Sequence, residues 1–107
     1  MVSEIVAEIQ ELTALNKKGV EALYDAEMAL AKCEADLDRL EAQAFINGTG
    51  SVAERQAFAK LECVEVRFAR DVSKAQVNRV RMKLRSVEAA LMAQATMSKL
   101  MQAEMKL

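Results

Sequence analysis

The chain of 107 residues has no proline, tryptophan or histidine, and only three glycines. A β-sandwich or β-barrel needs turn residues at intervals of about 8–12 positions, and this composition does not supply them. Without histidine there is no imidazole base and no metal site built on an imidazole ligand. No apolar run approaches the roughly 18 residues that span a bilayer. These absences indicate a mostly helical protein with very few chain reversals.

The residues that are present argue against a disordered chain, a secreted protein and an enzyme. Hydrophobic residues make up 52% of the chain and the formal net charge is −1, so the composition is that of a folded protein. The first eleven residues carry acid where a signal peptide carries basic residues. We therefore expect a cytoplasmic protein with two cysteine thiols. With no glycine-rich phosphate loop and no nucleophile beside a base, we expect a non-enzymatic protein with no catalytic residue, cofactor or metal.

One cluster of turn formers divides the chain, at residues 47–50 (NGTG). Asparagine and glycine tolerate positive φ, so this cluster can end a helix and reverse the chain. Ser51 and Glu54 follow with the spacing of a capping box, in which the Ser51 hydroxyl accepts from the Glu54 amide and the Glu54 carboxylate accepts from the Ser51 amide. A helix end followed at once by a helix start predicts two antiparallel helices.

The predicted architecture is all-α. A single domain, residues 1–107, forms a long antiparallel helical hairpin with coiled-coil-like packing. The first helix spans about residues 3–46 with Ser3 as its N-cap, the loop spans 47–50, and the second helix spans about 51–105.

The first helix carries a heptad seam. Its small and apolar residues follow one another at alternating steps of four and three, the rhythm of a coiled coil. Asn16 and Gly19 occupy seam positions and interrupt it. We expect a continuous helix with a weak point there, a true break being the alternative. The predicted seam consists of Ile5, Ile9, Leu12, Leu23, Ala26, Leu30, Cys33, Leu37, Leu40 and Ala44.

The second helix carries two apolar sets that do not share one heptad register. We expect the stripe to slip around residues 72–77, as at a stutter that locally unwinds a supercoil. The early set is Phe58, Leu61, Val64, Phe68 and Val72, and the later set is Val77, Val80, Leu84, Val87 and Leu91.

A register centred on the loop pairs residue i with residue 97 − i. Cys33 then lies next to Cys63, and we expect buried thiols there, a disulfide being the alternative. In the same register everything after about Thr96 extends beyond the start of the first helix. This overhang is a candidate docking surface, the alternatives being a frayed tail or a shifted register. Its candidate docking residues are Met97, Leu100, Met101 and Met105.

The apolar surface is wider than one seam, and a small fold without disulfides needs further burial. A homodimer that forms a four-helix bundle is the simplest solution. The predicted oligomer core consists of Ile9, Leu12, Leu23, Leu30, Leu37, Leu40, Phe58, Leu61, Phe68, Leu84 and Leu91.

The two arms differ in charge. Residues 1–46 carry ten acids and four bases, and residues 51–107 carry six acids and eleven bases. Complementary arms favour hairpin closure and antiparallel pairing. The alternative is nonspecific contact with nucleic-acid phosphates, although no aromatic residue accompanies the late bases as a stacking platform. The candidate nucleic-acid residues are Arg67, Arg70, Lys74, Arg79, Arg81, Lys83 and Arg85.

An acidic, alanine-rich first helix, the loop 48–55 (GTGSVAER) and the basic stretch 80–88 (VRMKLRSVE) together resemble small helical-hairpin accessory proteins of tailed bacteriophages. The resemblance covers about residues 20–95. It implies a protein made in the bacterial cytoplasm that accompanies phage recombination or replication, or acts on host machinery. It carries no catalytic residues to transfer.

The sequence therefore favours a protein that self-associates and acts by protein–protein contact. A nucleic-acid-binding accessory protein is the alternative. No membrane association is expected.

Overall fold

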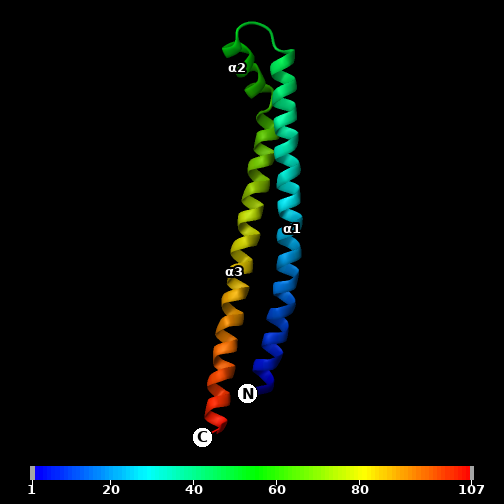
Figure 1. The fold of residues 1–107 in the computed structure, drawn as a ribbon. Coiled ribbons are helices and arrows are strands. Elements are labelled where there is room, and N and C mark those ends of the chain that lie inside the picture. The colour runs from blue at the N-terminus through cyan, green and yellow to red at the C-terminus, as the bar shows by residue number, and fades with distance from the viewer. Residues whose placement is uncertain (1, 107) are drawn as a thin grey trace. The chain divides into compact units, whose positions relative to one another are not determined.

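The structure is a computed structural model that describes residues 2–106. It contains three helices, α1 (Val2–Asn47), α2 (Val52–Glu62) and α3 (Val64–Lys106), and no strand within that range (Figure 1). The predicted all-α helical hairpin is confirmed. Helix α1 runs without interruption through Asn16 and Gly19, as expected.

The chain divides into two compact units, which are described separately. The loop unit is Asp25–Asn78 and contains the second half of α1, all of α2 and the start of α3. The terminal unit joins Met1–Tyr24 to Arg79–Leu107, and so contains the first half of α1 and the rest of α3. In each unit the α1 segment runs antiparallel to the segment that packs on it.

The reversal lies where the sequence predicts it, one residue later than expected, between Asn47 and Val52. Gly50 has φ +99°, in the left-handed region that favours glycine. The Ser51 hydroxyl caps α2 by accepting from the Glu54 amide at 3.2 Å. The second half of the predicted box differs, because the Glu54 carboxylate accepts from the Ser51 hydroxyl at 3.2 Å instead of from the amide.

Replacing the α2 cap tests this local structure. We expect Ser51→Ala to lower the free energy of unfolding by about 1 kcal/mol, because the Glu54 amide loses its acceptor. Ser3→Ala is the matched control: α1 begins at Val2, so Ser3 lies inside the helix and is not the predicted N-cap. Chemical denaturation followed by circular dichroism measures both. Equal effects of the two substitutions would contradict the assigned cap.

In the loop unit the α1 seam is confirmed, since its residues from Ala26 to Ala44 are buried or half-buried while most of their neighbours are exposed. The facing segment contributes positions that also alternate by four and three. These inward positions are Ala59, Cys63, Val66, Arg70, Ser73 and Val77.

That inward row corrects the expectation for the early part of the second arm. In the single chain the early set does not form the seam with α1, since Phe58, Leu61 and Phe68 are exposed, Leu61 by 74%. Their place in the oligomer core stays a prediction. The expected slip around residues 72–77 is wrong for the packing row. The inward row keeps its alternation of four and three through Val77 and on to Val80, Leu84, Val87 and Leu91. Small residues and one amphipathic residue occupy this part of the seam. The stem of Arg70 can cover apolar surface there while its charged head reaches solvent.

The terminal unit is held by a close approach between its two helical segments. Leu84 is 8% exposed, and a Cβ built on Gly19 would lie 2.7 Å from its Cδ1 atom. The glycine that interrupts the predicted seam is therefore the site that receives a leucine side chain. The other inward residues include two polar ones, Asn16 and Gln94, whose buried side-chain oxygens have no hydrogen-bond partner.

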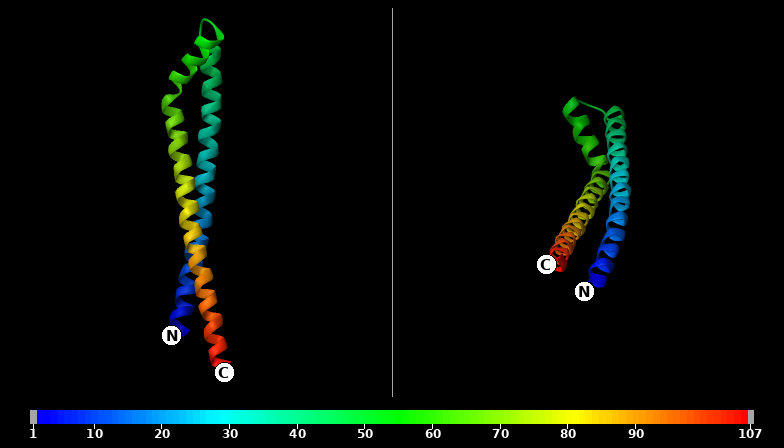
Figure 2. Two further views of the ribbon diagram at one scale, coloured as in Figure 1. Left: turned by 90° about the vertical axis from the view of Figure 1, so that its left-hand side faces the viewer. Right: turned by 60° about the horizontal axis from the view of Figure 1, so that its bottom comes forward.

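The second arm is two helices and not the single predicted helix 51–105. Cys63, 1% exposed, separates α2 from α3 with φ −103° and ψ 14°. Its amide still donates to the carbonyl of Ala59 at 3.1 Å, and its carbonyl accepts from the amide of Arg67 at 2.9 Å. The result is a local bend, and α2 leans away from the direction of α3 (Figure 2).

The bend shifts the register. Gly19 meets Leu84, whereas the register centred on the loop pairs Gly19 with Asn78. Because α2 is inclined, its residues advance less along α1 than those of a straight helix. The overhang predicted to begin after Thr96 is therefore wrong, and the shifted register, its alternative, holds: Ser98, Met101 and Met105 line a hollow of about 130 Å³ together with Ile5 and other residues at the start of α1.

The predicted proximity of the two cysteines is wrong for the same reason. Cys33 is half-buried and lines a hollow with Val66 and Ala69. Cys63 is buried and lines a different hollow, with Leu40 and Ala44. Both thiols are free.

Candidate interaction surfaces

The most distinctive surface of the loop unit is an apolar row on the outer face of α2 and α3. Its members are spaced by three, four, four and three residues: the last four share one face of α3, and Leu61 precedes them in the last turn of α2, before the bend. We call it the outer stripe. Its large residues are exposed by 74, 52, 69 and 53% in chain order. The outer stripe consists of Leu61, Val64, Phe68, Val72 and Ala75.

The stripe lies opposite the inward row of the same helices, so α1 does not cover it. Within α3 the stripe runs from Val64 to Ala75, a spacing of eleven residues or about three helical turns, so a second helix can lie along it. Isolated exposed apolar residues are ordinary, but a contiguous row of large ones marks an interaction surface.

The predicted oligomer core falls into two groups. In the terminal unit the buried or half-buried members are Ile9, Leu12, Leu23, Leu84 and Leu91. In the loop unit they are Leu30, Leu37 and Leu40. These eight residues face the other helix of the same chain. Leu61 and Phe68 face outward and belong to the outer stripe. Phe58 is 40% exposed and lines a hollow with Leu40 and Ala44 of α1. The hairpin seam and the outer surface are therefore separate features.

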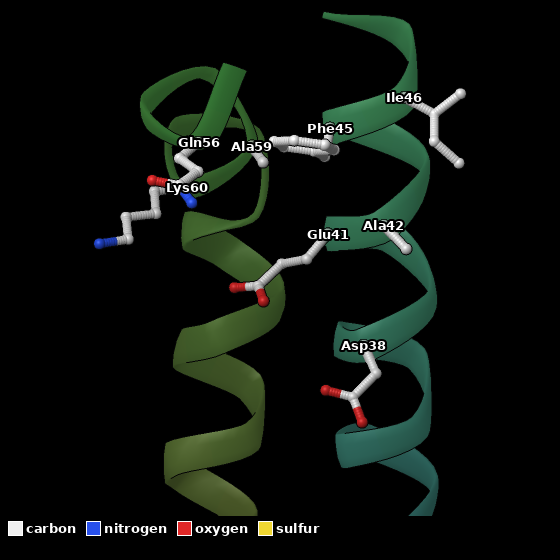
Figure 3. Close-up of a pocket in the computed structure, with 8 residues that line it drawn as sticks. All are labelled: Asp38, Glu41, Ala42, Phe45, Ile46, Gln56, Ala59 and Lys60. Carbon is white, nitrogen blue, oxygen red and sulfur yellow. The ribbon is translucent and has the colours of Figure 1, made fainter. Parts of the chain in front are cut away.

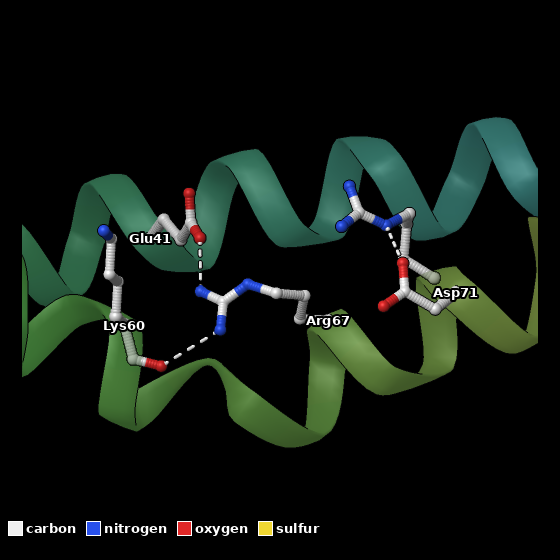
Figure 4. Close-up of polar contacts among 5 residues, drawn as sticks. Glu41, Lys60, Arg67 and Asp71 are labelled. Carbon is white, nitrogen blue, oxygen red and sulfur yellow. Dashed lines mark hydrogen bonds and ion pairs between the residues drawn. The ribbon is translucent and has the colours of Figure 1, made fainter.

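Two of the candidate nucleic-acid residues serve the fold (Figure 4). The Arg67 guanidinium donates to the Glu41 carboxylate at 2.8 Å and to the Lys60 carbonyl at 3.4 Å. Arg67 lies in α3, so these contacts span the bend at Cys63 and link α3 both to α1 and to the last turn of α2. Arg70 is half-buried in the seam, and its Nε donates to the Asp71 carboxylate at 2.7 Å.

The remaining candidate bases do not form one surface. All five are exposed. Lys74 belongs to the loop unit and the others to the terminal unit. Arg79, Arg81, Lys83 and Arg85 follow at steps of two residues, and each such step turns the side chain by about 200°. Arg79 and Lys83 therefore share one side of α3, Arg81 and Arg85 share another, and the four do not follow a single phosphate backbone.

The candidate docking residues are also divided. Met101 is half-buried in the seam of the terminal unit. Met97, Leu100 and Met105 are exposed by 50, 62 and 77%. Met105 lines the small hollow with Val2 and Val6. The four residues therefore do not act as one free surface.

The inclination of α2 opens a hollow of about 590 Å³ between it and the end of α1 (Figure 3). The Phe45 ring extends toward α2 beside Ala59, and Ile46 points away from α2. Arg55 closes the same end, because its guanidinium lies 4.4 Å from the centre of the Phe45 ring and donates to the Phe45 carbonyl at 3.0 Å. Of the carboxylates that line the hollow, Glu41 is bound by Arg67. Asp38 and Lys60 also line the hollow, so its lining carries charges of both signs.

Within residues 2–106 no group of three or more cysteine, aspartate or glutamate side chains is placed to hold a metal ion. No helix in that range has an apolar stretch long enough to cross a bilayer. No family model matches the chain, and comparisons with curated proteins and with solved structures find no similar protein.

Proposed function

We propose that the chain is a non-enzymatic interaction protein that self-associates through the outer stripe. The observation that carries this proposal is the row of large apolar side chains on the outer face of α2 and α3, each more than half exposed. Burial of such a row against a second copy removes it from water at about 25 cal/mol per Å². A second copy presents an identical row, so one surface satisfies both partners.

The total exposed area supports a partner. The chain exposes 8226 Å², whereas a compact monomer of 11.8 kDa exposes about 5900 Å². The excess exceeds the area of about 800 Å² that each partner contributes to a standard interface. Among the described residues, only Leu37, Ala44, Ala59, Cys63, Val77 and Leu84 are buried. So small a core also supports further burial by association.

Light scattering of the native chain at high micromolar concentration tests self-association. The proposal predicts twice the chain mass of 11.8 kDa. A stable species at the single-chain mass would contradict it.

On the resemblance of residues 20–95 to the phage accessory hairpins, we further propose that the dimer acts in the bacterial cytoplasm. Its larger partner would then belong to host or phage recombination or replication machinery. The resemblance is the support for this step, and co-purification from phage-infected cells tests it, with the Phe68→Glu variant as the control for the stripe.

Nucleic-acid binding is the less favoured function, because Arg67 and Arg70 are paired within the fold and the other bases diverge. We expect no retardation of single- or double-stranded DNA at about 50 mM salt, a concentration that would reveal phosphate-driven binding. A mobility-shift assay measures this. Retardation that disappears when Arg79, Arg81 and Arg85 are changed to glutamate would establish the alternative.

A further inference from the structure

The charges beside the outer stripe are sorted by side. Lys60, Arg67 and Lys74 each precede a stripe residue by one position and recur every seven residues, so they lie along one flank. Glu62 and Glu65 lie along the opposite flank. Lys60, Lys74 and both glutamates are exposed. Arg67 is engaged with Glu41, and Asp71, on the basic flank, is engaged with Arg70.

This sorting distinguishes the two ways in which identical stripes can pair. In a parallel pair, related by a two-fold axis along the helices, the basic flank of one copy faces the acidic flank of the other. In an antiparallel pair the basic flanks face each other. Opposite charges that flank an apolar seam favour a pairing, and like charges oppose it.

We propose that two copies of this chain pair in parallel through the outer stripe, with Lys60 of each copy facing Glu65 of the other. The offset of five residues is that of the flanking ion pairs in parallel coiled coils. The interface belongs entirely to the loop unit, and it brings the two loops to the same end of the pair. This inference rests on the proposed self-association and adds its orientation.

Cysteine cross-linking tests the orientation. In a parallel pair each stripe residue opposes its own counterpart, so Leu61→Cys and Ala75→Cys each cross-link to themselves under mild oxidation. In an antiparallel pair centred on Phe68, position 61 opposes position 75, so only a mixture of the two variants cross-links. Both substitutions are made in a Cys33→Ser, Cys63→Ala chain, and that chain alone is the blank on a non-reducing gel.

We expect a covalent dimer from each variant alone. Cross-linking only in the mixture, or none in a chain that keeps the dimer mass, would overturn the parallel pairing and leave self-association intact. If the native chain and the Cys33→Ser, Cys63→Ala chain both have the mass of a single chain, the proposed self-association is overturned.

Charge exchange in the native chain gives a second test that does not depend on the cysteine background. Lys60→Glu is expected to weaken dimerisation by about three- to tenfold, since two exposed ion pairs are lost. Adding Glu65→Lys restores the pairs with reversed sign and should recover the native affinity. In an antiparallel dimer Lys60→Glu would relieve repulsion by Lys74 of the second copy. Tighter association on that substitution would therefore contradict the proposal.

Discussion

Phe68→Glu is expected to convert the dimer to a monomer at concentrations where the native chain is fully associated. Phe68 is the central residue of the outer stripe and is 69% exposed in the single chain. In the dimer it would lie beside its counterpart, where two unpaired carboxylates would lose their hydration and repel each other. Burying one such side chain contributes about 1.5–3 kcal/mol. Both copies lose it, so the dissociation constant should rise by about a hundredfold or more.

Met92→Glu is the matched control for this substitution. Met92 is 72% exposed, but it lies in the terminal unit and on another side of α3, since the seventeen residues from Ala75 turn the side chain away from the stripe. We expect it to leave the dimer mass unchanged. Light scattering of both variants decides the matter, with circular dichroism to confirm that helicity is retained. Unchanged mass for both would show that the stripe is not the interface, and dissociation of both would show an effect of added charge alone.

Leu84→Ala is expected to lower the free energy of unfolding by about 2–5 kcal/mol, the cost of emptying a buried leucine site. Leu84 is 8% exposed and is the side chain that approaches Gly19 across the terminal unit. Denaturant titration at a fixed chain concentration measures the effect. Leu100→Ala is a suitable control, since Leu100 is 62% exposed and should change stability little.

The contact with Gly19 makes a sharper prediction for the same variant. In the native chain, Gly19→Ala gains about 1 kcal/mol of helix propensity, but its Cβ would lie 2.7 Å from Leu84 Cδ1, so the leucine must move and the gain is offset. In the Leu84→Ala chain that space is vacant, and the full gain should appear. The two substitutions should therefore not be additive. Equal effects of Gly19→Ala in both backgrounds would contradict the contact.

The seam of α1 was predictable because its signal is local. A four–three rhythm of apolar residues fixes one helical face wherever it lies in the chain, and Ile5, Leu23 and Leu37 follow it. The loop was predictable for the same reason, since glycine at position 50 supplies a positive φ that few other residues adopt.

The second arm was not predictable from apolar size. Leu61 and Phe68 belong to the predicted apolar face of the second arm, yet the seam at that level uses Ala59, Cys63 and Ser73. The four–three rhythm counted backward from Val77 passes through these residues, so the signal is present but weak in hydrophobicity. The second arm carries two rows that could pack on α1, the inward row and the outer stripe. The sequence pattern alone does not show which row faces α1.

The bend at Cys63 was not predictable at all, because no proline or glycine marks it. Tertiary contacts span it, notably those of the Arg67 guanidinium with Glu41 and with the Lys60 carbonyl. The register of the whole second arm follows from this bend. The predicted overhang and the predicted pairing of the cysteines were lost with it.

The dependence of thermal unfolding on chain concentration tests the central claim most directly. If a second copy covers the outer stripe, the unfolding midpoint of the native chain should rise between about 1 and about 100 µM, because association stabilises the folded state by mass action. In Phe68→Glu the midpoint should be lower and independent of concentration. A native midpoint that stays constant over that range would show that the hairpin is stable alone and that its outer face has no second copy to bind.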